Sequence, residues 1–404
     1  MTTLISFLGK GNYDPRHGYR NACYAFDRDF SRTVPFFGMA LADYLKPDRL
    51  ILVGTSGSMW DVFFERESGQ HDEALLELID AVEGDRVSTE MLAMHAARLS
   101  ERLGHAVDCV LIDYARDADG QARLLGQLAA HLHPGEQVAM DVTHSFRHLP
   151  MLALVAARFL EKVRGITVDD IYYGAYDMKD AASGAVPVVR LKGMLAMLDW
   201  VDALSSYDKD GDYAAFAPLF EAAGRKDAGQ LLRQAAFLER TNQVGQARNP
   251  LRKFREHSPS SESAMFALFH DALDERTRWV DQQTYTERQE TLAEQHLARG
   301  DYLRAATLGF ESIVSRLVQL RGGLDPMNYE HRREVKEALD GEIRAAGRAR
   351  ALTPAQTAYR DLRELRNALA HGSRSSFAEI QQVTASQERL HAFLADNLKR
   401  VRNL

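Results

Sequence analysis

Residues 137–150 read Gln-Val-Ala-Met-Asp-Val-Thr-His-Ser-Phe-Arg-His-Leu-Pro. The first six residues form a short, mostly apolar run, which is typical of a buried strand. The run breaks at Thr143-His144-Ser145, and a helical pattern of apolar residues follows from 150 to 163. Proline fits the first position of a helix. The stretch therefore predicts a strand, a polar loop and a helix in succession.

The same alternation recurs on both sides of this stretch, up to about residue 192. We expect further strands at residues 4–8, 49–53, 107–112 and 170–173, and helices at residues 33–45, 88–103 and 121–132. Apolar strands that alternate with helices indicate an α/β, Rossmann-like fold, with a mostly parallel sheet covered on both faces. In such folds ligands bind outside the carboxyl ends of the strands.

The strand pattern ends near residue 192, and the remainder reads as one helix after another. We therefore expect a sheet domain at 1–192, a helical connecting region at 193–290 and an all-α C-terminal domain at 291–404. Within the helical part, residues 245–261 contain an Asn-Pro pair and a Ser/Pro-rich run. These residues predict a loop between two helical blocks.

The composition limits the kinds of function. Of 404 residues, 45% are hydrophobic and 26% charged, and the net charge is -7. A protein that coats long nucleic acid is usually basic, so any contact with nucleic acid here must be local. Cys23 and Cys109 are too few for a disulfide framework or a thiolate zinc site. Because neither a signal peptide nor a run long enough for a bilayer is evident, we expect a cytoplasmic protein without a membrane partner.

The C-terminal part contains the residues that we expect to be catalytic. Residues 366–372 read Arg-Asn-Ala-Leu-Ala-His-Gly and end a long amphipathic helix. The spacing Arg-x4-His is a weak signal by itself. The chain contains it three times, at Arg66/His71, Arg252/His257 and Arg366/His371. The first match falls in a predicted loop and the second lies just before a Ser/Pro-rich loop, so the context selects the third.

These residue types suit metal-free RNA cleavage, in which the 2′-hydroxyl attacks the adjacent phosphorus. Histidine transfers protons near neutral pH. Arginine carries a permanent charge on a fork that matches phosphate oxygens, and it stabilises the charge that builds up on phosphorus. Asn367 can position a hydroxyl or an oxygen, and no acidic cluster is nearby to hold magnesium. We therefore expect Arg366, Asn367 and His371 to be catalytic, with no metal.

The spacing also has a geometric consequence. Positions i and i+5 of a helix point about 140° apart, so one straight helix aims Arg366 and His371 in different directions. We expect the site to need a helix end, or the same helix of a second subunit in a two-fold dimer. A second interpretation stays open, because a histidine at a helix C-terminus is often only a partner of the helix dipole.

Three segments carry a resemblance to known families. Residues 366–372 resemble the signature of HEPN ribonucleases, Arg-Asn-x3-His or similar. Residues 4–13, Leu-Ile-Ser-Phe-Leu-Gly-Lys-Gly-Asn-Tyr, and residues 141–150 resemble the first and fourth strand motifs of CARF domains, the ligand-sensing domains of CRISPR-associated proteins. Together they resemble the CARF–HEPN ribonucleases of type III CRISPR systems. The resemblance covers the sheet domain and about the last hundred residues, and residues 200–290 carry no motif.

The resemblance implies an N-terminal CARF domain and a C-terminal HEPN domain, paired in a homodimer or in a higher oligomer of dimers. It implies that cyclic oligoadenylate, made by the interference complex on detecting foreign RNA, binds the CARF domains and activates the HEPN site. The enzyme would then cut single-stranded RNA, and not DNA, with little sequence preference, leaving 2′,3′-cyclic phosphate and 5′-hydroxyl ends. We expect no cofactor besides this activator, with cyclic tetra-adenylate favoured and cyclic hexa-adenylate as the alternative.

We expect the activator to contact the breaks that follow the strands. Glycines let the backbone approach a ligand, and free amides at the start of a helix favour anions. Hydroxyls can donate hydrogen bonds, and tyrosine rings can stack on adenine. The expected ligand residues are Gly9, Lys10, Gly11, Asn12, Tyr13, Thr55, Ser56, Gly57, Ser58, Thr143, His144, Ser145, Phe146, Arg147 and Tyr176.

Structural alternatives exist for several of these residues. Ser/Gly loops after strands are usually turns, and Trp60 fits a core position as well as a ligand platform. His144 and His148 could suggest a metal, but such pairs are more often structural. The loops match neither the nicotinamide nor the P-loop pattern. Two other functions stay open: a nucleotide-sensing binding protein without RNase activity, and a CARF domain that cuts its own ligand through Thr143, His144 or Lys10.

Overall fold

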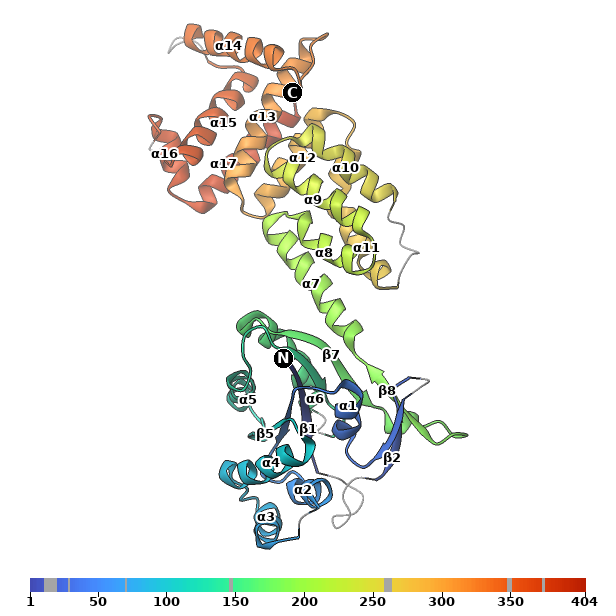
Figure 1. Ribbon diagram of the computed structural model, residues 1–404. Helices are drawn as coiled ribbons and strands as arrows, with labels where there is room; N and C mark the ends of the chain where they lie inside the picture. The colour runs from blue at the N-terminus through green and yellow to red at the C-terminus, as the bar shows by residue number, and fades with distance from the viewer. Residues whose placement is uncertain are drawn as a thin grey trace. The chain divides into compact units, whose positions relative to one another are not determined.

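A computed structural model of the chain, shown in Figure 1, describes residues 1–10, 20–27, 30–69, 71–144, 148–257, 264–346, 351–372 and 375–404, without the side chains of 148–150. The chain divides into two compact units, Met1–Ala196 and Met197–Leu404. Among the described residues, no helix combines the length and the apolar character needed to cross a membrane. The separate division that we expect at residue 290 stays a prediction.

The first unit is built on one sheet with the strand order β3-β2-β8-β7-β6-β1-β4-β5. The five predicted strands are all present and all parallel to their neighbours in this set: β1 (Thr2–Leu8), β4 (Arg49–Gly54), β5 (Ala106–Leu111), β6 (Gln137–Asp141) and β7 (Thr167–Gly174). The predicted α/β fold with a mostly parallel sheet is therefore confirmed.

Three further strands were not predicted from the sequence. They are β2 (Ala22–Ala25), β3 (Ser31–Val34) and β8 (Ala185–Arg190). Strand β8 pairs antiparallel with β7, and β2 and β3 extend the sheet beyond it. The helix predicted at 33–45 is shorter, because its first residues belong to β3 and α1 covers only Phe37–Leu45. Strands β2 and β3 have only four residues each, too few for a clear apolar periodicity, and β8 contains Pro187, which argues against a strand.

Alternate residues of the central strands point to opposite faces of the sheet. On β1, Leu4 and Leu8 pack into the layer formed with α1, α2 (Trp60–Ser68), α3 (Glu73–Glu83) and α4 (Thr89–Leu103). Ile5 and Phe7 pack into the opposite layer, with α5 (Ala118–Ala130) and α6 (His148–Phe159). Helices therefore cover both faces, as predicted. Helix α6 begins two residues before Pro150, which we expected at its first position.

The second unit is helical throughout its described residues. Its helices are α7 (Lys192–Asp210, which begins in the first unit), α8 (Ala217–Ala222), α9 (Lys226–Arg240), α10 (Val244–Glu256), α11 (Ala264–Thr277), α12 (Tyr285–Ala298), α13 (Tyr302–Leu320), α14 (Tyr329–Ala346), α15 (Pro354–His371), α16 (Ala378–Thr384) and α17 (Gln387–Arg402). The predicted all-α character of this part is confirmed.

The loop predicted at 245–261 is wrong over most of its length, because α10 continues to Glu256 with Pro250 inside it. Proline in a helix removes one hydrogen bond and destabilises the helix. Val244, Ala247, Leu251 and Phe254 are nevertheless buried at helical spacing in the core. Burial of this apolar face outweighs the local preference of the Asn-Pro pair.

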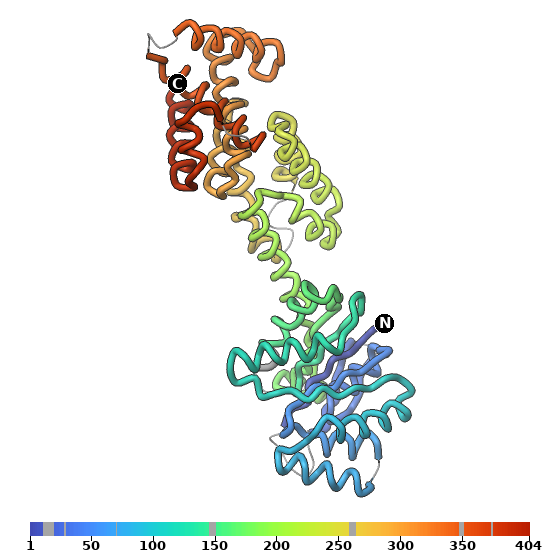
Figure 2. Tube along the Cα trace, turned by 90° about the vertical axis from the view of Figure 1, so that its left-hand side faces the viewer, coloured from blue at the N-terminus to red at the C-terminus, as the bar shows by residue number. Residues whose placement is uncertain are grey.

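Helices α13, α15 and α17 lie side by side (Figures 1 and 2) and meet around Gly309. A Cβ atom at this glycine would lie 2.9 Å from Leu398 and 3.4 Å from Leu362, so the close approach of the three helices requires glycine here. On α15, Asp361 faces Arg400 of α17 at 3.8 Å. Helix α16 connects α15 to α17, and the two helices run antiparallel (Figure 2).

Candidate functional site

The first candidate site lies at the carboxyl ends of β1 and β6. These two strands are adjacent in the sheet. The sheet continues from β1 to β4 on one side and from β6 to β7 on the other. Ligands in open α/β sheets bind at such a switch point. Ser6 and Asp141 are paired in register here, and the Ser6 hydroxyl donates a hydrogen bond to Asp141 Oδ2 at 2.6 Å.

A cavity of about 220 Å³ opens at this edge of the sheet. Two predicted ligand segments contribute to it, the Thr143-His144 break after β6 and Tyr176 after β7. The Thr143 hydroxyl oxygen accepts a hydrogen bond from the Gly174 amide at 2.8 Å, which ties the ends of β6 and β7 together. The full lining is Arg20, Tyr24, Thr143, His144, Tyr173, Gly174 and Tyr176.

Four of these lining residues were not predicted. Tyr173 and Gly174 directly precede Tyr176, so the end of the predicted strand could have pointed to them. Arg20 and Tyr24 belong to the segment around β2, a strand that the sequence did not reveal, and no motif marked them. Burial raises the pKa of the Tyr24 hydroxyl, so this group stays protonated and can donate a hydrogen bond.

Asp141 lies fully buried beside the cavity. Burial raises the pKa of its carboxyl to about 6, although hydrogen bonds from Ser6 and from the Thr143 amide, at 2.8 Å, act in the opposite direction. Helix α1 packs directly onto this pair. A Cβ atom at Gly38 would lie 2.1 Å from Ser6 Oγ, so only glycine fits between the helix and the strand.

His144 has a structural role that its place in a polar loop did not reveal. Its Nε2 accepts a hydrogen bond from the Phe37 amide at 3.1 Å, and Phe36, at the N-cap of α1, provides no side-chain cap. Burial lowers the pKa of His144 to about 3. The ring is therefore neutral near pH 7 and caps α1, and it offers no positive charge to a phosphate.

Thr55 and Ser58 were predicted to donate hydrogen bonds to the ligand, and in the structure both lie buried in the loop after β4. Each is only 1% exposed. The Ser58 hydroxyl donates to the Leu8 carbonyl at 2.7 Å and accepts from the Thr55 amide at 2.9 Å. Trp60 is fully buried and donates to the Thr55 carbonyl at 2.8 Å, so it is a core residue. These residues fix the loop after β4.

Ser56 and Gly57 belong to a different cluster from the cavity. The Ser56 hydroxyl and the Tyr114 hydroxyl, the latter at 3.0 Å, both donate to Asp85. These hydrogen bonds lower the pKa of Asp85. A Cβ atom at Gly57 would lie 2.6 Å from the Tyr114 oxygen, so the loop packs tightly on this ring. The cluster sits at the end of β4, one strand away from β1.

The remaining predicted ligand residues follow β1 and β6. Gly9 is buried, and its carbonyl accepts from the Met59 amide at 3.0 Å, whereas Lys10 is exposed. The predictions for Gly11, Asn12, Tyr13, Ser145, Phe146 and Arg147 lie outside the described residues. Their role as ligand contacts stays a prediction.

The second candidate site is the C-terminal end of α15. The helix begins with a capping box between Thr353 and Gln356, with Pro354 in its first turn. It buries one face, including Leu362 and Leu365, and ends at Gly372, whose φ of 59° is left-handed. Because the helix continues through 371, Arg366 and His371 lie on one helix, about 140° apart around the axis and about 7.5 Å apart along it.

Arg366 differs from the other arginines of α15. Arg360 pairs with Asp361 at 2.6 Å, and Arg363 pairs with Asp340 and with Glu364, the latter at 2.9 Å. Arg366 forms no ion pair with any residue that the structure describes. Its guanidinium lies 4.7 Å from the centre of the Phe310 ring, and its Nε is buried without a hydrogen-bond partner in the described chain.

Asn367 is half-buried and His371 is exposed at the helix end.

The two rejected Arg-x4-His matches are arranged differently. His71 is 72% exposed, 3.7 Å from Glu65, and lies beyond the end of α2. Arg252 pairs with Glu256 at 3.5 Å, and His257 Nδ1 contacts the Lys253 carbonyl at 2.8 Å, so this pair is engaged within its own helical turn.

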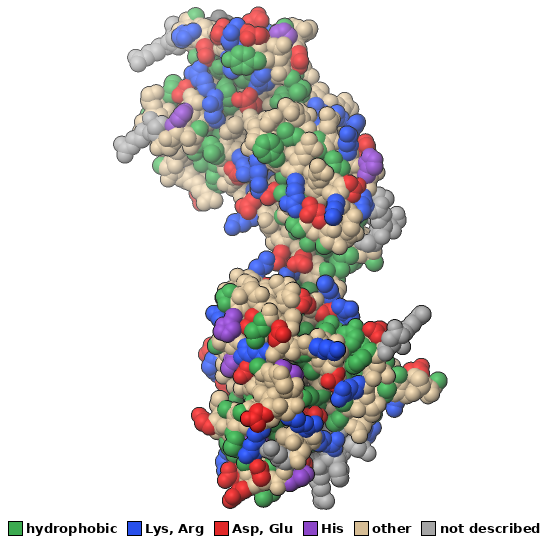
Figure 3. Space-filling view, in the orientation of Figure 1, with side chains coloured by type: hydrophobic (Ala, Val, Ile, Leu, Met, Phe, Trp, Pro, Cys, Tyr) green, Lys and Arg blue, Asp and Glu red, His purple; other side chains and the backbone are tan. Residues whose placement is uncertain are grey.

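Charge and metal chemistry are consistent with a local site. On the face drawn in Figure 3, Lys and Arg side chains alternate with Asp and Glu and form no single extended basic surface. In the described ranges, no group of three or more His, Cys, Asp or Glu residues is arranged to hold a metal ion. The alternative of a metal held by His144 and His148 is not tested, because the His148 side chain lies outside the described residues.

Comparisons with known proteins agree with this architecture. Residues 3–177 match the family described as CRISPR system endoribonuclease Csx1, CARF domain. The chain is 24% identical to the CRISPR-associated protein MJ1674 of Methanocaldococcus jannaschii, over 92% of this chain and 62% of that protein. It therefore spans about three fifths of the length of this curated relative.

A solved structure, Enterococcus italicus Csm6 bound to cyclic hexa-2'-fluoro-hexa-dAMP, aligns over 100% of this chain and 93% of that chain. The identity is 12% and the TM-score 0.42. The match at residues 3–177 and the CRISPR-associated relative agree with the predicted resemblance to CRISPR-associated proteins with a CARF domain.

Proposed function

We propose that the protein is an endoribonuclease that is switched on when cyclic oligoadenylate binds its CARF domain. The observation that carries the proposal is the state of Arg366, which has no ion pair among the described residues, whereas its neighbours Arg360 and Arg363 are paired. An arginine held over an aromatic ring and near a helix end is available for a phosphate. The family match at residues 3–177 supports the ligand-sensing half of the proposal.

In the proposed reaction the RNA 2′-hydroxyl attacks the adjacent phosphorus, and the 5′-oxygen of the next nucleotide leaves. His371 transfers a proton in this step, and Arg366 stabilises the charge that builds up on the phosphate oxygens. Asn367 positions a hydroxyl or an oxygen. The products are a 2′,3′-cyclic phosphate and a 5′-hydroxyl, and no metal takes part.

The angle between Arg366 and His371 argues for a dimeric site. Two side chains about 140° apart on one helix cannot both face one phosphate. A two-fold axis beside the end of α15 brings Arg366 of one subunit toward His371 of the other. We therefore propose a homodimer as the active form.

The activator is proposed to bind the cavity at the ends of β6 and β7, extended by the neighbouring loops. Arg20 supplies positive charge for a phosphate, and Tyr173 and Tyr176 supply rings for an adenine. A cavity of about 220 Å³ holds one nucleotide rather than a whole ring, so a ring ligand on the dimer axis would use one such cavity in each subunit. Cyclic tetra-adenylate and cyclic hexa-adenylate are the two candidates.

The test is RNA cleavage by the purified full chain. A labelled single-stranded RNA is incubated with the protein and EDTA, with no ligand, with cyclic tetra-adenylate or with cyclic hexa-adenylate. We expect cleavage with one of the two rings, and fragments whose 3′ ends resist a phosphatase until the cyclic phosphate is opened. Tight binding of a ring without cleavage would contradict the proposal and would favour a binding protein without RNase activity.

A further inference from the structure

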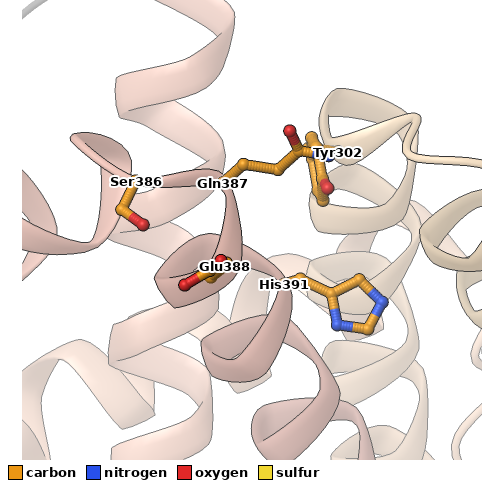
Figure 4. A pocket seen from close by; sticks show the side chains of 5 residues that line it. All are labelled: Tyr302, Ser386, Gln387, Glu388 and His391. Carbon is orange, nitrogen blue, oxygen red and sulfur yellow. The ribbon is translucent and has the colours of Figure 1, made fainter.

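A groove of about 750 Å³ lies between the first turns of α13 and α17 (Figure 4). Its lining residues are Tyr302, Ser386, Gln387, Glu388 and His391. The volume falls within the range of roughly 300–1,000 Å³ that is usual for small-ligand sites. The Gln387 side chain extends toward Tyr302, and Glu388 and His391 follow along the first turns of α17.

The groove lies at the same end of the helical unit as His371. Asp361 of α15 and Arg400 of α17 face one another, and the two helices run antiparallel. His371 lies ten residues beyond Asp361, and His391 lies nine residues before Arg400. Because each residue adds about 1.5 Å along a helix, His371 and His391 reach nearly the same level.

Of the polar side chains that line the groove, only Ser386 has a hydrogen bond within the described residues that stabilises the fold. Ser386 caps α17, since its hydroxyl accepts from the Arg389 amide at 3.4 Å. Gln387, Glu388 and His391 are exposed, and they form no hydrogen bond or ion pair within the described part of the chain. A half-buried tyrosine ring, an amide, a carboxylate and an imidazole therefore line the groove, and the amide, the carboxylate and the imidazole make no hydrogen bond within the described part of the chain.

We propose that this groove is a base-recognition subsite for the RNA substrate, with guanine as its preferred base. Tyr302 stacks on the base, as aromatic rings do in sites for single-stranded RNA. Glu388 repels a phosphate, but its two carboxylate oxygens match the adjacent N1–H and N2–H donors of guanine. No other RNA base presents two neighbouring donors. Gln387 completes the hydrogen bonding at the base edge.

The proposal rests on the proposed RNase function, and it adds a preferred cleavage position. The experiment uses single-stranded RNAs that carry one guanine, adenine, cytosine or inosine in an otherwise constant uridine sequence. Cleavage positions are mapped in EDTA with the activating ring present. We expect a cut at a fixed distance from guanine, about 10-fold faster than from any other base. Inosine, which lacks the N2 amino group, should lose most of this preference.

The matched variants are Glu388→Gln in the groove and Glu379→Gln on α16, an exposed glutamate outside it. Glu388→Gln should abolish the guanine preference, and Glu379→Gln should preserve it. Cleavage without any base preference, or a preference that survives Glu388→Gln, would overturn the subsite. A preference that appears only when EDTA is left out would overturn it too, because it would point to a metal held by Glu388 and His391.

A binding measurement separates failure of the subsite from failure of the RNase function. Guanosine 5′-monophosphate should shift the NMR signal of the His391 ring, and neither adenosine 5′-monophosphate nor the Glu388→Gln variant should show the shift. If no RNA is cut but this shift occurs, the RNase function fails and the subsite stands. If the guanosine nucleotide leaves the His391 signal unchanged, the subsite is refuted whatever the activity.

Discussion

Replacing Asp141 by asparagine should remove a pH dependence from the stability of the N-terminal unit. The Asp141 carboxyl is fully buried and accepts hydrogen bonds from Ser6 and from the Thr143 amide. Burial raises its pKa and the hydrogen bonds lower it, and the resulting pKa is about 6. The prediction tests whether burial is the larger effect.

The magnitude follows from the shift. The pKa rises from 3.8 to about 6, and each pKa unit corresponds to about 1.4 kcal/mol, so the native state loses about 3 kcal/mol between these pH values. A raised pKa means that the native state binds a proton more tightly than the unfolded chain. The stabilising contribution is therefore complete below pH 3.8 and is lost as the pH rises through about 6.

The lowered pKa of His144 acts in the opposite sense. Its contribution is complete above the ordinary value of 6.5 and is lost as the pH falls toward about 3. The free energy of unfolding of the unit therefore contains two contributions that change with pH in opposite directions. The informative quantity is the difference between wild type and Asp141→Asn, because His144 is present in both proteins and its contribution cancels.

The assay is urea unfolding of the full chain, followed by fluorescence of Trp60. The other two tryptophans, Trp200 and Trp279, lie in the second unit and are replaced by phenylalanine, so that the signal reports the first unit alone. We expect the wild type to lose about 3 kcal/mol relative to Asp141→Asn between pH 4 and pH 7. If the difference in the free energy of unfolding between the two proteins stayed constant, or if the wild type became relatively more stable as the pH rises, the hydrogen bonds would outweigh burial.

The same fluorescence assay tests two further features, and an activity assay tests a third. Gly38→Ala places a Cβ atom 2.1 Å from Ser6 Oγ and should destabilise the first unit by about 3 kcal/mol. Gly126→Ala, which has open space around the new Cβ atom, should be neutral or stabilise the unit by up to about 1 kcal/mol. Equal effects of the two changes would contradict the packing argument. His144→Ala removes the cap of α1 and should cost about 1 kcal/mol, and an unchanged urea midpoint would argue against the cap. RNA cleavage should keep its rate in excess EDTA, and loss of cleavage that Mg²⁺ restores would refute the metal-free mechanism.

The sequence predicted the fold well where elements are long and periodic. The five central strands and the division into a sheet unit and a helical unit follow from apolar runs and amphipathic patterns. The sequence failed where tertiary packing decides the structure. Pro250 lies inside α10 because the helix buries Val244, Leu251 and Phe254, and this burial outweighs the loop preference of the Asn-Pro pair. The four-residue strand β2 forms only because a neighbouring strand pairs with it.

Prediction of the sites depended on whether burial could be read from a motif. The context that selected Arg366 and His371, the end of an amphipathic helix before a glycine, is the one that α15 shows. For Thr55 and Ser58 residue type suggested a ligand contact, but their hydrogen bonds are used inside the loop. His144 lies in a polar segment, so the sequence did not indicate that its neutral ring caps helix α1. Hydroxyl and imidazole groups serve both purposes, and only the structure distinguishes them.

The most direct test of the account compares Arg366→Ala with Arg363→Ala in RNA cleavage at saturating activator. The two arginines lie one turn apart on α15, but Arg363 is ion-paired and Arg366 lies over Phe310. Loss of a group that stabilises charge in the transition state typically lowers the rate by about 100- to 1,000-fold. We predict a loss of this size for Arg366→Ala and a near wild-type rate for Arg363→Ala. Equal rates in the two variants would contradict the assignment of Arg366 to the catalytic site.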